Sequence, residues 1–160
     1  MIFVTVGSQL PFDRLINAVD KWAANNTYKR VFAQIGVSEY IPQNINFCKS
    51  MMPSEYNSYF KKADIIIAHA GMGTIISALE LGKPLILLPR LACKGEHRND
   101  HQLSTIKRFA TFTNIYVSNN ESELPELINN LVNKKKPLVK HDLSEVSSEL
   151  ISAIKKFVND

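Results

Sequence analysis

Residues 63–74 read ADIIIAHAGMGT, and this stretch decides the fold. A run of β-branched residues stops at His69, a short loop carrying Gly71 and Gly73 follows, and a helix-forming segment continues to Leu81. The order of strand, loop and helix places the loop at the carboxyl end of the strand. Ligands of open α/β sheets bind at this edge, so the loop is the first candidate site.

The loop after His69 has the features of a phosphate site. Gly71 and Gly73 have no Cβ, so their backbone N–H groups can come close to a ligand. The first turn of the following helix adds unpaired N–H donors and a partial positive charge. Two interpretations stay open from these residues: a cradle for an anionic ligand, or a tight strand-to-helix turn whose histidine only packs.

The composition predicts one globular domain. The chain has 160 residues, of which 45% are hydrophobic and 21% charged, and this is enough for a core without disulfides or metals. The formal net charge is +4 and the pI is about 9.1, with three lysines together at 134–136. This balance suits an anionic ligand or an anionic membrane surface. We expect no nucleic-acid binding, because no basic helix with interleaved aromatic residues occurs.

Targeting signals and cysteines indicate a cytoplasmic protein. The N-terminus begins directly with a strand-like segment at 2–6 instead of the charged region of a signal peptide. No apolar run approaches the length of a membrane span. Cys48 and Cys93 have no metal-ligand spacing, and free thiols fit a reducing compartment. We therefore expect a cytoplasmic protein that is peripheral to the inner face of the membrane only through a partner.

Strand and helix patterns alternate along the chain. Strands are expected at 2–6, 30–35, 46–49, 64–68, 85–88 and 114–117. Helices are expected at 11–24, 53–62, 74–81, 97–109, 121–133 and 143–158. This alternation predicts an α/β fold, a Rossmann-like parallel sheet with helices on both faces. One domain is expected over 1–160, with a core at 1–133 and a basic linker and last helix at 134–160.

A second polar cluster follows the strand at 85–88. Residues 96–102 read EHRNDHQ, a dense group of ionisable and amide side chains. This cluster, the loop at 69–74 and the Gly7-Ser8 turn after the first strand all follow carboxyl ends of strands, so they can meet at one edge of the sheet. The alternative is a charged helix N-terminus, in which Glu96 complements the helix dipole.

Two further chemistries are compatible with residues of this cluster. His97 and His101 are four apart and could hold zinc on one helix face, but Arg98 places a cation beside the first histidine. A Ser-His-Asp mechanism is also open, although no Gly-x-Ser-x-Gly elbow occurs. The favoured expectation is a site without a metal or cofactor.

The motifs taken together resemble a known family. The resemblance lies in His-Ala-Gly-x-Gly-Thr at 69–74, Gly-Lys-Pro at 82–84, Pro-Arg at 89–90, EHRNDHQ at 96–102, and FVTVG at 3–7 with Pro11-Phe12 and Leu15. Over almost the whole chain this pattern resembles the family 28 glycosyltransferases. More narrowly, it is similar to the small "enhancer" subunits of bacterial capsular and exopolysaccharide galactosyltransferases, and to the small subunit of the eukaryotic dolichol-linked N-acetylglucosaminyltransferase. The resemblance implies the C-terminal, donor-binding half of a GT-B fold.

The resemblance also implies a donor, a partner and a set of contacts. The donor would be a UDP-sugar, the partner a membrane-associated acceptor-binding glycosyltransferase subunit, and the acceptor a lipid-linked saccharide. His69 and the backbone from Gly71 to Thr74 would contact the diphosphate, and residues 50–53 would line the uracil pocket. The implied nucleotide-sugar-binding residues are Gly7, Ser8, Met51, His69, Ala70, Gly71, Met72, Gly73, Thr74, Glu96, Asn99, Asp100, His101 and Gln102.

Two parts of the implied chemistry are left open by the sequence. Ser77 stands where many relatives carry a Glu that holds the ribose hydroxyls, and Glu80, one turn on, is the alternative carboxylate. The reaction would be displacement at the anomeric carbon, in which the leaving nucleoside diphosphate is stabilised and an acceptor hydroxyl is positioned. The sequence identifies no general base, and this group could belong to the partner.

Two other functions compete with a donor-binding subunit. A non-catalytic activator would stabilise a partner that holds the whole active site, and it would not need the polar groups at 96–102. A free-standing nucleotide-binding or sugar-epimerising enzyme would need both halves of such a fold, whereas 160 residues are expected to encode one.

Overall fold

The computed structural model describes residues 1–28 and 30–133. The strands are β1 (Ile2–Thr5), β2 (Val31–Gln34), β3 (Asn46–Cys48), β4 (Ile65–His69), β5 (Leu85–Leu88) and β6 (Ile115–Val117). The helices are α1 (Asp13–Ala24), α2 (Pro53–Lys62), α3 (Met72–Glu80), α4 (His101–Phe109) and α5 (Leu124–Asn133), with a short 3-10 helix η1 (Ala92–Lys94). Each strand and helix expected within 1–133 is present, and the helix expected at 143–158 lies outside the described residues.

The six strands form one parallel sheet in the order β3-β2-β1-β4-β5-β6. The chain adds β2 and β3 on one side of β1 and then returns to the centre, so that β4 pairs with β1 and Ala68 lies opposite Thr5. This reversal creates a crevice beyond the carboxyl ends of β1 and β4, where doubly wound sheets bind their ligands. The expected parallel α/β architecture is confirmed.

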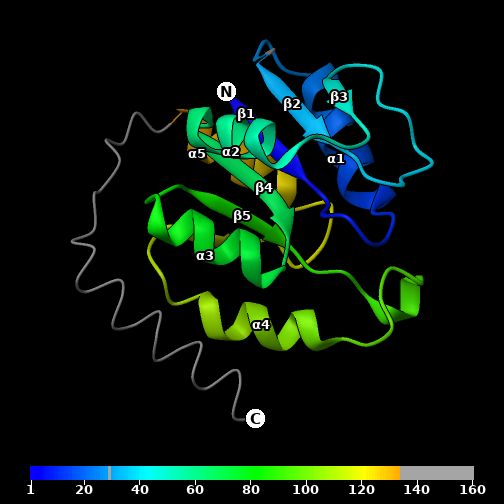
Figure 1. Cartoon of the computed structure of the whole chain (residues 1–160), viewed down its shortest axis with the longest axis vertical. Helices are drawn as coiled ribbons and strands as arrows, with labels where there is room; N and C mark the ends of the chain where they lie inside the picture. The colour runs from blue at the N-terminus through cyan, green and yellow to red at the C-terminus, as the bar shows by residue number, and fades with distance from the viewer. Residues whose placement is uncertain (29, 134–160) are drawn as a thin grey trace.

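Helices cover both faces of the sheet, because successive side chains of a strand point to opposite faces. On one face, Val4 of β1 belongs to an apolar cluster with Leu15 of α1 and Ile128 of α5. On the other face, Phe3 belongs to a cluster with Ile75 of α3 and with residues of α2 and α4. Figure 1 shows the arrangement of the helices around the central strands. A core on both faces explains the uninterrupted apolar runs of β4 and β5.

The segment before α4 differs from the sequence expectation. The helix expected from residue 97 begins at His101. The Ala92 N–H donates to the Asp100 carboxylate (2.8 Å), and the Leu91 N–H donates to the Glu96 carboxylate (2.9 Å). These bonds compete with helix formation and hold the segment as a loop. The polar cluster is therefore a folded loop that precedes α4, and only its last residues are helical.

Within residues 1–28 and 30–133, no helix combines the length and apolar character needed to cross a bilayer.

Candidate functional site

His69 lies at the crevice, at the last position of β4. Its ring is flanked by Gly7, which follows β1, and by Gly71, the N-cap of α3. A Cβ at Gly7 would lie 2.8 Å from His69 Cε1, and a Cβ at Gly71 would overlap Nε2. Gly7 also has a φ of +76°, which other residues rarely adopt. The histidine ring itself therefore requires glycine at both positions.

The imidazole of His69 is neutral near pH 7. Burial, together with the positive charge of Arg90, lowers the pKa of His69 from 6.5 to about 4. Its Nδ1 is buried and has no hydrogen-bond partner in the part of the chain that the structure describes. Buried polar atoms in folded proteins are normally hydrogen-bonded. The backbone of Thr5 acts on the same ring and partly offsets the lowering of its pKa, so His69 lies between the ends of β1 and β4 in the wall of the crevice.

The N-terminus of α3 opens beside this histidine. The first bond within the helix runs from the Ile75 N–H to the Gly71 carbonyl (3.1 Å), so the N–H groups of Met72, Gly73 and Thr74 have no partner inside the helix. The first turn of α3 has no acidic side chain. Nothing lies within 4 Å of a Cβ placed at Gly73, so this turn has open space around it. The arrangement suits an anion.

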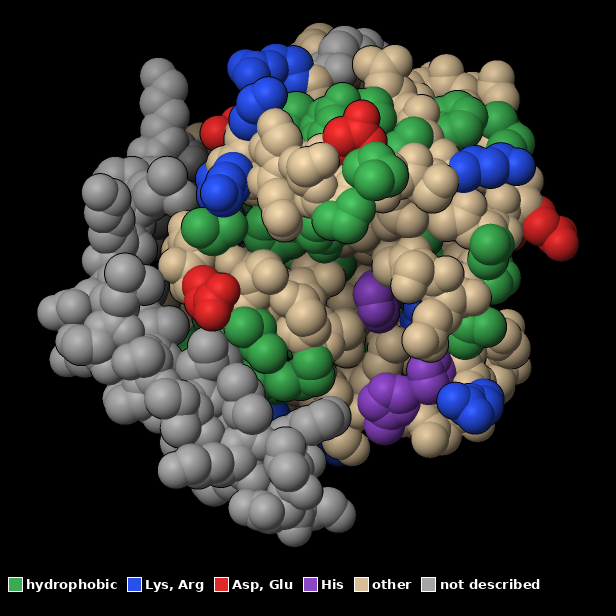
Figure 2. Space-filling view, viewed as in Figure 1, with side chains coloured by type: hydrophobic (Ala, Val, Ile, Leu, Met, Phe, Trp, Pro, Cys, Tyr) green, Lys and Arg blue, Asp and Glu red, His purple; other side chains and the backbone are tan. Residues whose placement is uncertain are grey.

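Two adjoining cavities surround these groups. The first, the His69 pocket, has a volume of about 330 Å³ and is lined by Val6, Gly7, Ser8, Gln9, Leu10, His69, Gly71, Gly73, Thr74, Arg90, His97 and Gln102. The second, the Tyr56 pocket, has a volume of about 750 Å³ and is lined by Thr5, Gly7, Ser8, Gln34, Gly36, Val37, Ser38, Lys49, Ser50, Met51, Pro53 and Tyr56. Both include Gly7 and Ser8, so one elongated ligand could occupy the two together. Figure 2 shows histidine side chains gathered on one part of the molecular surface.

A buried amide joins the loops that form the Tyr56 pocket. Gln34, at the end of β2, accepts a hydrogen bond from the Thr5 hydroxyl (2.8 Å). Its Nε2 donates to the carbonyls of Gly7 (3.0 Å) and Lys49 (3.2 Å). Burial raises the pKa of Tyr56, so its hydroxyl remains protonated at neutral pH. Gln34 therefore ties together the loops that follow β1 and β3, on either side of its own strand.

Arg90 forms a buried clamp beside the His69 pocket. The residue is 2% exposed, and its guanidinium lies 4.8 Å from the centre of the Phe12 ring. Its terminal nitrogens donate to four backbone carbonyls, those of Val6 (2.8 Å), Leu10 (2.7 Å), Pro11 (2.6 Å) and Glu96 (3.1 Å). The clamp holds the β1–α1 loop against the loop after β5. The expected site did not include Arg90, although its position directly after a buried strand was a signal.

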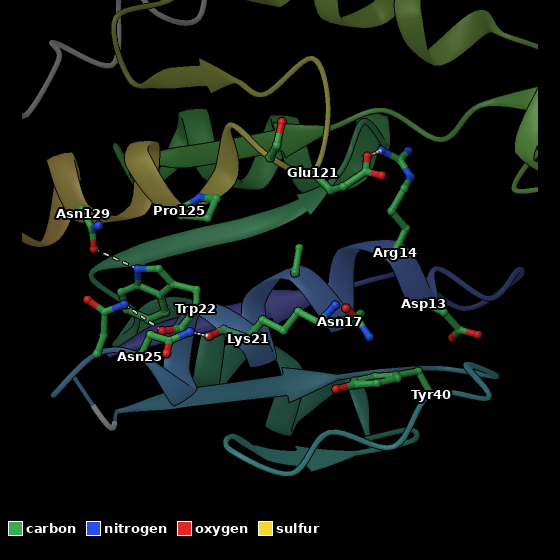
Figure 3. Close-up of a pocket in the computed structure, with 13 residues that line it drawn as sticks. Asp13, Arg14, Asn17, Lys21, Trp22, Asn25, Tyr40, Glu121, Pro125 and Asn129 are labelled. Atoms are coloured by element: carbon green, nitrogen blue, oxygen red, sulfur yellow. Dashed lines mark hydrogen bonds and ion pairs between the residues drawn. The ribbon is translucent and has the colours of Figure 1, made fainter.

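A second arginine, Arg14 of α1, pairs with the Glu96 carboxylate. Arg14 Nε lies 2.7 Å from Glu96 Oε1 and NH2 lies 2.8 Å from Oε2, with both side chains about one-tenth exposed (9% and 10%). Arg14 also pairs with Glu121 (3.0 Å), as Figure 3 shows, and Glu121 pairs with Lys94 (3.1 Å). The network connects α1 with the loops before α4 and α5. The Glu96 carboxylate is thus already engaged within the protein.

The expected site residues separate into two groups. Those that line one of the two pockets are Gly7, Ser8, Met51, His69, Gly71, Gly73, Thr74 and Gln102. The side chains of six others do not line either pocket: Ala70, Met72, Glu96, Asn99, Asp100 and His101. Ala70 is buried, and Met72 packs against the apolar cluster under α3. The Met72 backbone N–H is still part of the open helix N-terminus.

Gln102 is fixed by the protein through one end of its amide. The residue is 3% exposed, and its Oε1 accepts hydrogen bonds from the N–H groups of Ala70 (3.2 Å) and Arg90 (3.0 Å). These two bonds set the orientation of the amide, because only its oxygen can accept. They leave the Nε2 group to bond with a ligand in the pocket that Gln102 lines. Gln102 therefore joins the loop after β4 to the loop after β5.

His97 and His101 form a pair beside this pocket. Their ring centres lie 4.4 Å apart in an edge-to-face arrangement, and His101 Nδ1 contacts the Asn99 side chain. His97 lines the His69 pocket, although the expected contact set did not contain it. Among the described residues, no group of three or more His, Cys, Asp or Glu side chains could hold a metal ion. The pair alone does not make the zinc site that the spacing left open.

A third cavity, of about 570 Å³, lies between α1 and α5 and is drawn in Figure 3. Asn17 and Lys21 of α1 line it opposite Asn129 of α5, to which the Trp22 indole N–H donates a hydrogen bond (2.8 Å). None of its lining residues belongs to the His69 pocket or the Tyr56 pocket. This cavity is therefore distinct from the candidate site at the edge of the sheet.

Comparison with known proteins identifies the class to which this fold and site belong. Residues 1–157 match the glycosyltransferase family 28 C-terminal domain, and the chain belongs to that family. The resemblance found in the motifs is confirmed.

Relatives with a known role are subunits of a sugar transferase. The UDP-N-acetylglucosamine transferase subunit ALG13 of Candida albicans is 32% identical over 100 residues, which cover 62% of this chain and 32% of that protein. The human subunit of the same name is 31% identical over 119 residues, which cover 67% of this chain and 10% of that protein. The matched regions thus span about a third and a tenth of these relatives.

Solved structures show the same fold. MurG of Acinetobacter baumannii superposes with a TM-score of 0.61 at 19% identity, covering 82% of this chain and 41% of that chain. The solution structure of ALG13 gives a TM-score of 0.59 at 19% identity, covering 90% of this chain and 92% of that chain. The six-stranded parallel sheet with its helices is the C-terminal half of the GT-B glycosyltransferase fold.

Proposed function

We propose that this chain is the donor-binding subunit of a two-part glycosyltransferase that uses a UDP-sugar. The observation that carries the proposal is the His69 pocket, where the open N-terminus of α3 lies beside a neutral histidine and a buried arginine. The adjoining Tyr56 pocket has the volume for a nucleoside. The chain then functions as a single nucleotide-sugar-binding domain.

The proposed ligand lies across both pockets. The diphosphate binds at His69 and the N–H groups of Met72, Gly73 and Thr74, since the Gly71 N–H already donates to the His69 carbonyl (2.8 Å). Gly7-Ser8 lies at the junction of the pockets. The base binds in the Tyr56 pocket beside Met51. The sugar points toward Gln102 and the neighbouring loop that carries Glu96, Asn99, Asp100 and His101. This direction follows because Gln102 lines the His69 pocket on the side of α4.

The reaction is displacement at the anomeric carbon of the donor. The open helix end provides fixed donors for the charge that develops on the leaving diphosphate, and such preorganised groups need little rearrangement during the reaction. The neutral His69 has one ring N–H, which can donate a hydrogen bond to the diphosphate. No residue of this chain is proposed as the general base that activates the acceptor hydroxyl.

A membrane-associated partner supplies the acceptor-binding half in this proposal. One observation supports it: the relatives of known role are named as subunits of a transferase. We propose that the acceptor is a lipid-linked saccharide and that the complex acts in capsular or exopolysaccharide synthesis. The chain would then work at the cytoplasmic face of the membrane, held there by its partner.

A second candidate function is a non-catalytic activator of such a partner. One observation favours it: the carboxylates of Glu96 and Asp100 are engaged with Arg14 and with backbone N–H groups. These groups therefore do not by themselves argue for sugar binding. The two functions differ in whether the His69 pocket takes part in the reaction.

Co-expression with a candidate membrane partner tests the proposal. The complex is assayed for transfer from a panel of UDP-sugars to a lipid-linked acceptor, with the isolated chain and a His69→Ala complex in parallel. We expect transfer by the complex, none by the isolated chain, and a loss of about tenfold or more in the variant, since a hydrogen bond to a charged group is worth roughly 1.5–3 kcal/mol. Full activity of an intact His69→Ala complex would establish the activator function instead.

A further inference from the structure

Arg90 places a positive charge beside the His69 pocket, and its hydrogen bonds go to neutral groups. Its terminal nitrogens donate to four backbone carbonyls. The nearby Glu96 offers Arg90 only its backbone carbonyl, because the Glu96 carboxylate is bonded to Arg14 and to a backbone N–H. A buried charge is costly unless an opposite charge or hydrogen bonds compensate it. Here the carbonyls satisfy the N–H groups, but they do not neutralise the charge.

The charge of Arg90 is only partly offset. The ion pairs around it join Arg14 with Glu96 and Glu121, and Glu121 with Lys94. Arg90 contacts this network through the Glu96 backbone carbonyl, and the Glu96 carboxylate attracts its charge without bonding to it. Glu96 therefore serves two arginines, and the one without an ion pair of its own among the described residues, Arg90, lines the His69 pocket.

We propose that Arg90 is the positioning residue that makes the His69 pocket selective for a diphosphate, and this rests on the function proposed above. Its hydrogen bonds hold the β1–α1 loop, which carries Gly7 and Ser8, in place around the ligand. Its charge acts on the diphosphate through space, because all of its terminal N–H groups are engaged with carbonyls. Charges interact more strongly in a site shielded from water than at the surface. A bound diphosphate compensates the charge that the folded chain offsets only in part.

This role predicts a particular loss of selectivity. A residue that only held the loop would affect every ligand of the two pockets alike. A residue that also supplies charge affects UDP much more than uridine, which has no phosphate. Arg90→Lys keeps the positive charge but loses the planar guanidinium group with its several N–H donors. Arg90→Met keeps a side chain of similar length and loses the charge.

Calorimetry on the full chain measures the affinity of UDP and of uridine for Arg90→Met, Arg90→Lys and the wild type. Arg98→Met is the matched control, since Arg98 is exposed in the same loop. We expect Arg90→Met to weaken UDP about tenfold or more and uridine less than about threefold, because tenfold corresponds to about 1.4 kcal/mol. Arg90→Lys should keep most of the ratio between the two affinities, and the control should keep both.

If Arg90→Met does not fold, a second variant, Glu121→Gln, tests the charge role of Arg90. Glu121 is partly exposed, and Glu121→Gln removes one anion from the network while leaving Arg90 in place. It should tighten UDP by about twofold in low salt and leave uridine unchanged, because longer-range charge effects are small and screened. Equal losses of UDP and uridine in Arg90→Met, or no change of UDP in Glu121→Gln, would overturn the charge role. A wild-type chain that bound UDP no better than uridine would instead overturn the proposed function.

Discussion

The loop at 69–74 and the loop at 96–102 lie at the same edge of the sheet, yet their polar groups differ in whether the protein itself already bonds them. In the first loop, the N–H groups at the start of α3 and the Nδ1 of His69 have no partner within the helix or the described residues. In the second, the carboxylates of Glu96 and Asp100 are already bonded to the protein. A dense polar sequence can therefore be structural, while a nearly apolar one can hold the free donors.

Because of this difference, substitutions in the two loops should affect different properties, namely ligand affinity and the stability of the fold. Changes in the 96–102 loop should act mainly on stability, because they remove bonds within the protein. Changes in the 69–74 loop should act mainly on the ligand, because its donors are free. Gln102 joins the two loops through the N–H groups of Ala70 and Arg90, so it belongs to both.

Glu96→Ala is expected to have the largest effect on stability. The substitution removes the bidentate partner of Arg14, which keeps Glu121, and it also removes the acceptor of the Leu91 N–H; together these losses cost about 3 kcal/mol. The free energy of unfolding, measured by urea denaturation, should fall by about this amount. UDP affinity of the folded protein should not fall.

Glu126→Ala is the control for this change, since Glu126 is exposed on α5. Its effect on stability should lie within about 0.5 kcal/mol. A Glu96→Ala protein that unfolds like the wild type but has lost UDP binding would move Glu96 from the fold to the ligand site. The division between the loops would then be wrong.

The low pKa of His69 predicts that the folded chain becomes less stable in acid. Its pKa is about 4 in the folded chain and 6.5 in an ordinary environment, so the unfolded state takes up the proton first as the pH falls. The neutral ring is therefore fully favourable above pH 6.5, and the free energy of unfolding falls between pH 6.5 and pH 4. At 1.36 kcal/mol per pKa unit, the loss is at most about 3 kcal/mol.

His69→Gln removes this titration and keeps a polar side chain of similar size. Urea denaturation at several pH values between 7 and 4 should show a flatter dependence in the variant. The other titrating groups are the same in both proteins, so the difference between the two curves belongs to His69. Parallel curves would show that His69 is not held neutral by burial.

Gly71→Ala and Gly73→Ala form a matched pair within one turn. The Cβ of Gly71→Ala would overlap the His69 ring, and such overpacking costs about 1–3 kcal/mol. The Cβ of Gly73→Ala meets nothing within 4 Å, so the fold should be unaffected or slightly stabilised. Chemical denaturation measures both, and calorimetry with UDP then shows whether either position lies against the phosphate. Equal stability of the two variants would contradict the position of the His69 ring.

The sequence predicted the sheet and the first loop because their signals are local. The apolar strand, His69 and the glycines lie within twelve residues, and their order fixes where the loop stands. Gly71 was interpreted through a ligand, whereas the structure shows that the His69 ring already requires it. That requirement depends on the orientation of the His69 ring relative to the turn that follows it, which the sequence does not state.

The second loop could not be predicted because its bonds connect distant parts of the chain. Arg14 and Glu96 are 82 positions apart, and Arg90 bonds to carbonyls about 80 positions away. No spacing rule connects such pairs before the topology is known. EHRNDHQ therefore looked like a set of ligand contacts, and the structure shows that its two carboxylates hold the loop. The pairing partner of Glu96 is Arg14 of α1, a residue that the sequence pattern did not connect with this loop.

Substitutions of Gln102 should give the smallest and most specific effect, because the amide oxygen bonds to the protein whereas the amide nitrogen is left for a ligand. Gln102→Ala removes the acceptor of the Ala70 and Arg90 N–H groups and should cost about 1–2 kcal/mol of stability. Gln102→Glu keeps an acceptor for both N–H groups and replaces the Nε2 donor, so it should be closer to the wild type in stability. If the donor sugar lies toward this amide, both variants lower UDP-sugar turnover in the complex with the partner. Gln102→Ala should change UDP affinity by no more than about threefold. Gln102→Glu also adds a carboxylate to the pocket that holds the diphosphate, so it should weaken UDP as well. The decisive comparison is therefore turnover at saturating UDP-sugar. A stable Gln102→Glu protein with low turnover assigns Nε2 to the sugar, whereas a stable protein with full turnover confines Gln102 to joining the two loops.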